Sequence, residues 1–314
     1  MPDDLLPAPA GTPSHPGPRR DHGAPGPFAA LDLGTNNCRL LVGCPAAPTF
    51  RVLDSFSRIV RLGEGLAATG RLSEAAMDRA LAALEACAEK LARRRPRAIQ
   101  AVATEACRRA ANGRAFLARV EAETGLRLRV ITAREEAELA MESCAPLLEA
   151  GDRRALLFDI GGGSTEIAWV RVHPGGGAPE LIGYISVPVG VVTLSERGGP
   201  SCFTEAGFHA VVDEVARRLR EFDAVHSIAR EIRAGGVRLM GTSGTVTTLA
   251  GVALALPRYR RPLVDGQTLD AEVADQALGD LFALGREGLA AHPCVGPDRV
   301  EFVLPGCAVY AAIR

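Results

Sequence analysis

The sequence has no marked excess of charge of either sign and no long apolar run. Its 314 residues carry a formal net charge of −1, so no overall positive field favours binding to nucleic acid. None of its apolar stretches approaches the roughly 20 residues that a membrane-spanning helix needs. We therefore expect neither a nucleic-acid partner nor a membrane partner.

Paired cysteines are also missing. Eight cysteines are present, but none forms a CxxC pair or another spacing typical of a metal site. Several stand in apolar or helical contexts, as reduced thiols do. Because reduced thiols are typical of the cytoplasm, we predict a cytoplasmic protein.

The first 27 residues contain no apolar segment of the kind that a signal peptide needs. They are rich in Pro, Gly and Ala, and they carry Asp3 and Asp4 where a signal peptide has basic residues. This composition predicts a disordered leader over residues 1–27. With 47% hydrophobic residues overall, the chain has the length and the apolar content for two domains with their own cores.

One pattern occurs twice in the chain. It reads FAALDLGTNNCRLLV from Phe28 and LLFDIGGGSTEIAWV from Leu156. Aligned on Asp32 and Asp159, each copy has an apolar run that ends on Asp, a turn of Gly and small polar residues, and a second apolar run. One copy alone would be an ordinary β-hairpin. Its repetition in the same register predicts two related hairpins.

Such a turn is suited to bind phosphate. Gly lets backbone N–H groups approach an anion closely, and an Asp at the mouth of the turn can hold a hydrated Mg²⁺ against the phosphate. Two copies that face one another would hold a polyphosphate from both sides. A third segment of small residues, GTSGT at 241–245, is predicted to be a loop that opens a helix, whose free N–H groups also suit a phosphate.

The segments between the hairpins predict helices and buried strands. Ser73 is a candidate N-cap of a helix that Pro96 terminates. The apolar strand that follows should deliver Thr104 and Glu105 to the carboxyl end of a sheet, where ligands bind in α/β proteins. A strand over residues 126–132 then leads to a helix that begins at a capping box of Thr132 and Glu135.

Glu136 lies in the first turn of that helix. Acids there can simply favour the helix N-terminus, or one of them can point into a cleft and act in chemistry. Periodicity alone leaves both interpretations open.

The three small-residue turns in this order resemble the acetate kinase, hsp70 and actin superfamily, in which a nucleotide or phosphate lies between two duplicated domains. Seven segments resemble, more closely, the exopolyphosphatase and guanosine pentaphosphate phosphohydrolase family in its short two-domain form. They are DLGTNNCRLLV, AVATEACRRAAN, VITAREEAEL, FDIGGGSTEI, VPVGVVTL, GTSGTVTTLA and FVLPGCAVYAA. The resemblance implies an α/β fold of two duplicated ribonuclease-H-like domains, residues 28–133 and 134–314, with a cleft between them.

The resemblance also implies a site, residue by residue. Glu136 matches the general base, and Asp32, Asp159 and Glu166 match acids that hold Mg²⁺. The positions that match phosphate contacts are Gly34, Thr35, Asn36, Arg39, Arg108, Gly161, Gly162, Gly163, Ser164, Gly241, Thr242, Ser243, Gly244 and Thr245. For Arg39, a salt bridge to Glu166 across the cleft is an equal alternative. Near a helix N-terminus, Glu136 is expected to stay ionised at neutral pH.

The implied activity is release of terminal orthophosphate from inorganic polyphosphate by Mg²⁺-assisted attack of water. Hydrolysis of guanosine pentaphosphate needs the same water, base and metal, and it is the alternative substrate. Two further alternatives are phosphate transfer to a sugar or acetate and a non-catalytic sensor of guanosine tetraphosphate or polyphosphate. The family also makes a homodimer possible.

Three features depart from the family pattern. Asp265 stands where relatives have His, and Ser243 stands where Gly is common. Relatives also continue past the segment that ends here at Arg314, through a strand into a final helix that packs on the first domain. We expect either a truncated sequence or the loss of that supporting element.

Overall fold

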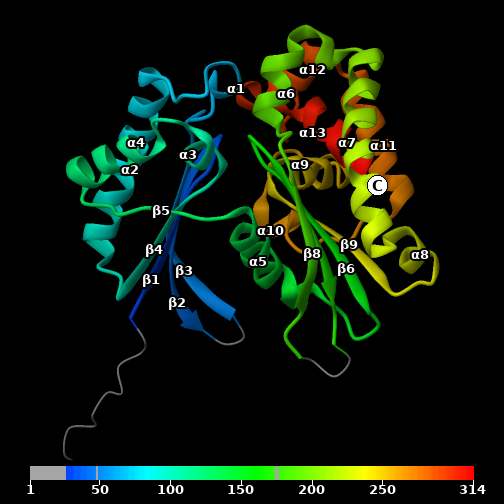
Figure 1. Ribbon diagram of the computed structural model, residues 1–314, viewed down its shortest axis with the longest axis horizontal. Helices are drawn as coiled ribbons and strands as arrows, with labels where there is room; N and C mark the ends of the chain where they lie inside the picture. The colour runs from blue at the N-terminus through cyan, green and yellow to red at the C-terminus, as the bar shows by residue number, and fades with distance from the viewer. Residues whose placement is uncertain (1–25, 47–48, 174–176) are drawn as a thin grey trace, which may run out of the picture.

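The computed structural model describes residues 26–46, 49–173 and 177–314. The predicted leader therefore lies outside the described residues except at its last two positions. Figure 1 shows two α/β units side by side, with the chain passing from the first unit to the second at α5. Each unit contains one sheet.

The first unit is built from the N-terminal half of the chain. Its strands are β1 (Phe28–Leu33), β2 (Asn37–Ala46), β3 (Thr49–Ile59), β4 (Ala98–Ala103) and β5 (Arg129–Val130). Its helices are α1 (Leu66–Thr69), α2 (Glu74–Arg94), α3 (Glu105–Arg109) and α4 (Gly113–Thr124). The strand predicted over residues 126–132 is thus confined to the two residues of β5.

The second unit is richer in helices. Its strands are β6 (Arg154–Ile160), β7 (Thr165–Arg171), β8 (Glu180–Val187) and β9 (Val237–Thr242). Its α-helices are α5 (Ala133–Cys144), α6 (Val191–Gly198), α7 (Glu205–His226), α8 (Ile228–Arg233), α9 (Ser243–Ala253), α10 (Arg261–Val264), α11 (Ala271–Ala283), α12 (Gly285–Ala291) and α13 (Val300–Ile313). Short 3₁₀ turns lie at Ala145–Leu147, Gly199–Phe203 and Pro297–Arg299.

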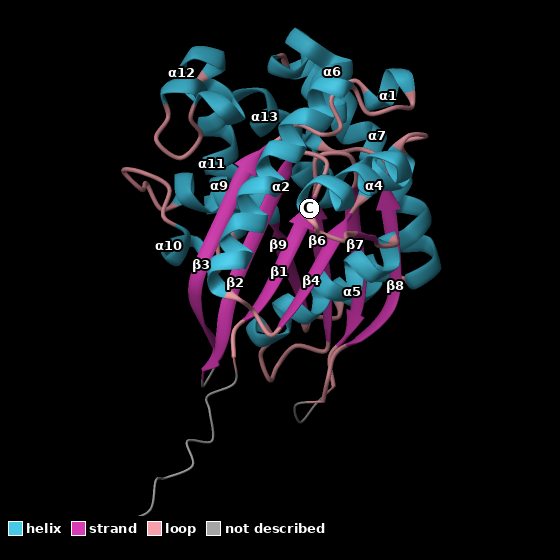
Figure 2. Ribbon diagram, turned by 90° about the vertical axis from the view of Figure 1, so that its left-hand side faces the viewer, coloured by secondary structure: helices cyan, strands magenta, loops and turns pink. Residues whose placement is uncertain are grey.

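The two sheets repeat one topology. The first has the strand order β3-β2-β1-β4-β5 and the second has the order β8-β7-β6-β9. In each, the first strand of the repeated pattern pairs antiparallel with the next strand and parallel with the strand that follows the crossover. Figure 2 shows the strands of both sheets with helices packed around them. The predicted α/β fold of two duplicated units is confirmed.

The hairpin register places equivalent residues at equivalent positions. Asp32 lies opposite Arg39 on β1 and β2, and Asp159 lies opposite Glu166 on β6 and β7. Each Asp is therefore the last polar residue before its turn, and the two turns stand at the same end of their sheets. This common end is where the units meet.

The long helix of the first unit forms for the predicted reasons. The Ser73 side chain accepts a hydrogen bond from the N–H of Ala76, and the helix ends where Arg95 takes a left-handed φ of 46° before Pro96. Its buried face includes Leu81, Leu84 and Cys87. These residues pack with β1 and β2 in one apolar core.

Helix α5 belongs by its packing to the second sheet. Its Ala137 and Cys144 are buried against Leu157 of β6 and Ala168 of β7. The larger core of the second unit lies on the other face of that sheet, where α6, α7, α9 and α13 gather. Helix α5 thus carries its N-terminus to the boundary between the two units.

The predicted GTSGT loop does not exist as a loop. Strand β9 includes Gly241 and Thr242, and α9 starts at the next residue, Ser243. The chain makes this turn with a φ of 78° at Ser243, a left-handed conformation that costs a non-Gly residue of the order of 1 kcal/mol. The strand therefore joins the helix through one strained residue.

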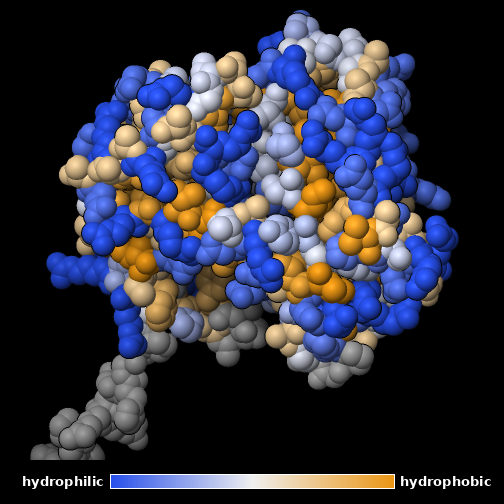
Figure 3. Space-filling model, viewed as in Figure 1, coloured by the Kyte–Doolittle hydropathy of each residue, from blue (hydrophilic) through white to orange (hydrophobic). Residues whose placement is uncertain are grey.

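Among the described residues, no helix has both the length and the apolar character to cross a membrane. On the face drawn in Figure 3, hydrophilic residues predominate, and hydrophobic residues come to the surface as separate patches on both units. Large exposed apolar side chains include Phe50 and Ile99 in the first unit and Val225 in the second.

Gly190 supports the turn of the second hairpin through its lack of a side chain. A β-carbon at this position would lie 2.4 Å from the carbonyl carbon of Gly162, so backbone would have to move. We expect Gly190→Ala to lower the free energy of unfolding by about 1–3 kcal/mol. Urea unfolding followed by circular dichroism measures this loss.

Gly244→Ala is the matched control, because a β-carbon at Gly244 has no neighbour within 4 Å. Inside α9 the added methyl group should be neutral or stabilise the helix by up to about 1 kcal/mol. Equal losses from both variants would contradict the packing role of Gly190.

Candidate functional site

The turns of the two hairpins touch each other across the boundary between the units. A β-carbon on Gly162 would lie 3.1 Å from the side chains of Thr35 and Asn36, and one on Gly163 would lie 2.8 Å from Oγ1 of Thr35. Only glycine fits such a close approach without displacing a neighbour. The first turn, residues 34–36, and the second turn, residues 161–164, therefore form one surface.

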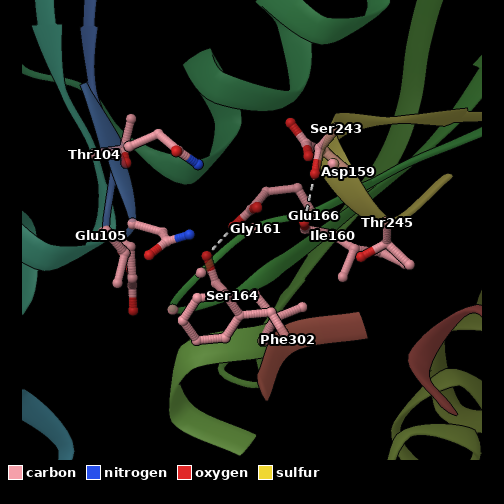
Figure 4. Close-up of a pocket in the computed structure, with 18 of the residues that line it drawn as sticks. Thr104, Glu105, Asp159, Ile160, Gly161, Ser164, Glu166, Ser243, Thr245 and Phe302 are labelled. Atoms are coloured by element: carbon pink, nitrogen blue, oxygen red, sulfur yellow. Dashed lines mark hydrogen bonds between the residues drawn. The ribbon is translucent and has the colours of Figure 1, made fainter. Parts of the chain in front are cut away.

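This surface encloses a cavity of about 130 Å³. Most of the residues implied by the family resemblance line it. They are Asp32, Gly34, Thr35, Asn36, Arg39, Glu136, Asp159, Gly161, Gly162, Gly163, Ser164, Glu166, Ser243, Gly244 and Thr245. Figure 4 shows Thr104 and Glu105 of the first unit on one side, facing Asp159 and Glu166 of the second.

Three implied positions do not line the cavity. Gly241 and Thr242 lie within β9, where a β-carbon on Gly241 would meet the ring of Phe158 at 2.5 Å. The lack of a side chain at Gly241 thus makes room for the ring of Phe158. Arg108 lies behind the cavity wall, in contacts described below.

Asp32 and Asp159 bring two carboxyl groups to one place. The pKa of Asp32 is raised to about 6, chiefly by burial; the charge of Arg39 opposes the rise and the charge of Asp159 adds to it. Burial also raises the pKa of Asp159, which Arg39 and the nearby Ser243 and Thr242 hydroxyls offset in part. The cavity is therefore short of positive charge between its two turns.

Glu166 is held by hydroxyl groups. Ser164 and Ser186 donate hydrogen bonds to its Oε1 at 2.6 and 2.9 Å, and burial raises its pKa to about 7. Among the described residues Arg39 forms no ion pair with Glu166, so the salt-bridge alternative for Arg39 is not realised. Arg39 instead is exposed at the cavity wall.

The capping box of α5 separates the roles of two adjacent acids. Oγ1 of Thr132 accepts the N–H of Glu135, and Oε2 of Glu135 accepts the N–H of Thr132. Glu135 also pairs with Arg129 at the surface. With Glu135 occupied, Glu136 is the acid of this turn that lines the cavity.

The expectation that Glu136 stays ionised at neutral pH is wrong. Burial raises its pKa to about 8, with Glu166 and Asp159 adding to the rise and Arg108 opposing it. The helix N-terminus does not outweigh burial beside two other acids. Glu136 needs added positive charge in the cavity to be a base at pH 7.

Arg108 uses its guanidinium on protein acceptors. It donates to Oε2 of Glu105 at 2.6 and 3.0 Å, to the carbonyl of Ile131 at 2.7 Å, and to Oε2 of Glu136 at 3.3 and 3.4 Å. The resemblance implied that Arg108 faces the substrate phosphates. Its contacts in this structure are with carboxylates and a carbonyl instead.

The two local departures from the family pattern have different consequences. Ser243 donates to the carbonyl of Ile160 at 2.6 Å, which ties β9 and α9 to β6 beside the second turn. Asp265 is exposed and lies 3.9 Å from Arg261, one helical turn away. Asp265 does not line the cavity.

Several cavity residues were not identified from the sequence. Thr248 comes from α9, Arg299 from the turn before α13, and Phe302 from α13. Thr248 and Phe302 stand inside two of the segments that carry the family resemblance, but neither was singled out, and Arg299 stands in none of them. Their place in the cavity depends on how α9 and α13 pack. Glu105 was located at the carboxyl end of β4 by strand position alone, and it does line the cavity.

The donor set fits Mg²⁺ through Asp32 and Asp159. No three His, Cys, Asp or Glu side chains of the described residues are grouped so as to hold an ion on their own. Asp32 and Asp159, whose charges repel, match the preference of Mg²⁺ for one or two carboxylates completed by water and substrate phosphate. The resemblance also implied Glu166 as a ligand; two hydroxyls donate to its Oε1, and its role at a metal stays a prediction.

The cavity also contains an unsatisfied acceptor. Oδ1 of Asn36 is buried and has no hydrogen-bond partner among the described residues. A buried acceptor without a donor is unfavourable. A ligand or its water in the first turn would supply the donor.

Comparison with known proteins identifies the family. The model of the Ppx/GppA phosphatase family matches residues 45–313. The chain belongs to the Ppx/GppA phosphatase family. The matched range starts after the first turn, whereas alignments with individual Ppx/GppA relatives cover 91% of the chain.

Individual relatives carry names of two activities. A guanosine-5'-triphosphate,3'-diphosphate pyrophosphatase of Aeromonas hydrophila is 32% identical over 91% of this chain and 54% of its own length, so the chain spans about half of that curated relative. An exopolyphosphatase-like protein of known structure is 29% identical over 91% of this chain and 88% of that one, with a TM-score of 0.78. The Ppx/GppA protein of Aquifex aeolicus is 25% identical over 91% and 89%, with a TM-score of 0.71.

The raised pKa of Glu166 predicts that this acid lowers the free energy of unfolding more at high pH than at low pH. The folded protein holds the Glu166 proton up to about pH 7, whereas the unfolded chain loses it near pH 4.5. Ionisation therefore lowers the free energy of unfolding as pH rises through this window. Glu166→Gln, which cannot ionise, should raise the melting temperature above wild type by a few degrees at pH 8, and by little at pH 5.

Thermal unfolding without divalent cations measures the difference at each pH. Glu138→Gln, at an acid that pairs with Arg134 on the solvent side of α5, is the control and should show no pH-dependent gain. If Glu166→Gln raised the melting temperature equally at pH 5 and pH 8, ionisation of buried Glu166 would not be what destabilises the protein.

Proposed function

We propose that this chain releases terminal orthophosphate from inorganic polyphosphate by Mg²⁺-assisted attack of water. One observation carries the proposal. Two glycine-rich turns from duplicated hairpins meet within van der Waals distance, and Glu136 faces the cavity that they enclose. The turns suit the terminal phosphate, and the carboxylate suits the water that attacks it.

The binding step uses backbone more than side chains. The N–H groups of Gly34 and Gly161 close their own hairpins by donating to the carbonyls of Asn37 and Ser164. The remaining N–H groups of the two turns suit the oxygens of the terminal phosphate, and the start of α9 at Ser243 adds a helix N-terminus. Arg39, which is exposed at the cavity wall, supplies a charge for the next phosphate along the chain.

The chemical step needs a base in line with the scissile bond. Glu136 takes a proton from the water as the water oxygen bonds to the terminal phosphorus. The bond from that phosphorus to the bridging oxygen breaks, and its electron pair stays on the shortened polyphosphate. Orthophosphate and a polyphosphate one unit shorter leave the site.

Asp32 and Asp159 would hold Mg²⁺, which when bound supplies positive charge to the phosphate oxygens and the leaving oxygen. The same charge would lower the pKa of Glu136 from about 8, because an added cation favours ionised carboxylates. Glu136 would then be ionised at neutral pH. Substrate binding and ionisation of the base would therefore both depend on Asp32 and Asp159.

The size of the cavity favours the end of a polymer as ligand. Its volume of about 130 Å³ is below the roughly 300–1,000 Å³ of pockets that enclose a whole small molecule. A wider groove of about 700 Å³ adjoins it and shares Asn37, Ile59 and Arg299 with it. The groove adds Arg58 and Arg61, and its arginines suit the remaining phosphates of a chain.

Guanosine pentaphosphate is the second candidate substrate. The name of the Aeromonas hydrophila relative favours it, and its terminal phosphate could enter the same cavity. Comparing kcat/KM for guanosine pentaphosphate with kcat/KM for medium-chain polyphosphate distinguishes the two. We expect kcat/KM to be at least tenfold higher for polyphosphate. A higher kcat/KM for guanosine pentaphosphate would make the nucleotide the proposed substrate.

Orthophosphate release from medium-chain polyphosphate tests the proposed chemistry. With Mg²⁺ present, Glu136→Gln should lower kcat by roughly a hundredfold or more, as loss of a general base does. Asp159→Asn should cause a similar loss, and excess Mg²⁺ should restore part of it. Chelation of divalent cations should abolish wild-type turnover.

Glu135→Gln is the matched control, since Glu135 precedes the proposed base but its side chain caps α5. We expect its kcat to stay within about threefold of wild type, with only the modest stability cost of a weakened cap. If Glu135→Gln lost activity and Glu136→Gln kept it, Glu136 would not be the base.

A further inference from the structure

Arg108 links the first unit to the acid proposed as the base. It lies on α3, which follows β4 of the first sheet, whereas Glu136 lies on α5, which packs on the second sheet. The guanidinium contacts Oε2 of Glu136 through both of its terminal nitrogens, at 3.3 and 3.4 Å. One residue of the first unit thus fixes the carboxylate carried by the second.

Glu105 fixes Arg108 in turn. Its Oε2 accepts from Nη2 and Nε of Arg108 at 2.6 and 3.0 Å, shorter than the contacts to Glu136. The carbonyl of Ile131, one residue before the N-cap of α5, accepts from Nη1 at 2.7 Å. Every nitrogen of the guanidinium therefore has a protein acceptor, and its orientation is set from three sides.

The burial of the three side chains makes these contacts strong. Arg108 is 22% exposed, Glu105 12% and Glu136 22%. Charge-assisted hydrogen bonds between such groups exceed those at an open surface. Glu105 and Glu136 both line the cavity while Arg108 does not, so a phosphate there would meet the two carboxylates before it met the guanidinium.

We propose that Arg108 and Glu105 form a positioning pair for Glu136, and that Arg108 is not a phosphate ligand. Glu105 holds the guanidinium, and the guanidinium holds the Glu136 carboxylate towards the water. This inference rests on the proposed role of Glu136 as base. It assigns to Glu105 a function that its place on α3 does not otherwise explain.

The arrangement makes the orientation of the base depend on contact between the units. Ile131 belongs to the first unit, where its N–H donates to the carbonyl of Ala103 on β4. Of the contacts made by Arg108, only the one to the Glu136 carboxylate therefore crosses to the second unit. Separation of the units would release Glu136 from its only ion-pair partner among the described residues. A base that is oriented only in the assembled cleft hydrolyses a phosphate only after the phosphate is enclosed.

Separate effects on turnover and binding test the positioning role. Arg108→Met should lower kcat for polyphosphate by roughly a hundredfold, the loss that misplacement of a reacting group by about 1 Å can cause, with KM within about threefold of wild type. Arg108→Lys, which keeps the charge but cannot reach three acceptors, should recover only part of kcat. A tenfold or larger rise in KM with kcat unchanged would show that Arg108 binds phosphate and would overturn the proposal.

Glu105 acts only through Arg108, so its effect should vanish when Arg108 is absent. Glu105→Gln alone should lower kcat by about tenfold or more with KM unchanged. The same substitution in the Arg108→Met background should add less than about twofold. Full additivity of the two losses would contradict a common role. Arg109→Met is the matched control, because Arg109 is 40% exposed and lies 3.7 Å from the other carboxylate oxygen of Glu105.

A binding experiment distinguishes failure of this inference from failure of the proposed function. In the Glu136→Gln background, calorimetric titration with tripolyphosphate and Mg²⁺ needs no turnover. Arg108→Met should leave Kd within about threefold, whereas Arg39→Met should raise Kd by tenfold or more, the worth of a charge-assisted contact. Equal rises in Kd for both variants would overturn the proposal even if wild type hydrolysed neither substrate.

Discussion

The close approach of two turns determines the rest of this structure. Gly162 and Gly163 of the second hairpin lie against Thr35 and Asn36 of the first, with no room for a β-carbon between them. Each turn ends a strand at the same edge of its sheet, so duplication of one hairpin brings the two turns that we propose bind phosphate face to face. Packing of α5 on the second sheet then carries Glu136 to the same point. The site is thus formed by the turns of the two related hairpins and the N-terminus of α5.

The same approach crowds acids together. Asp32, Asp159, Glu136 and Glu166 come from four different elements, and burial raises the pKa of each of them. Such a cluster is unfavourable to the fold while it is ionised. In the proposed function a divalent cation would relieve the repulsion between Asp32 and Asp159 and would favour the ionised form of the others. The unfavourable burial of these four acids and the proposed chemistry of the site therefore have one cause.

Sequence reasoning identified features that depend on local pattern and could not identify those that depend on packing. The repeated pattern predicted two related hairpins with Asp32 and Asp159 at equivalent positions, which the strand pairing confirms, and the capping box of Thr132 and Glu135 was visible as a four-residue motif. The expected ionisation of Glu136 was wrong, because it considered only the helix start and not Glu166 and Asp159 from other strands. Residues 241–245 had the composition of a loop, yet pairing with β6 extends β9 through Thr242. The contacts of Arg108 and the presence of Phe302 follow from elements that meet only in the folded chain.

The central claim is that Asp32 and Asp159 jointly hold a divalent cation where the two turns meet. The most direct measurement is anomalous diffraction from crystals of Glu136→Gln grown with Mn²⁺ and tripolyphosphate. The account predicts one strong anomalous peak within coordination distance of both carboxylates, with phosphate density between residues 34–36 and 161–164. Phosphate bound in the cleft with no peak at either aspartate, or a peak held by Glu166 alone, would contradict it.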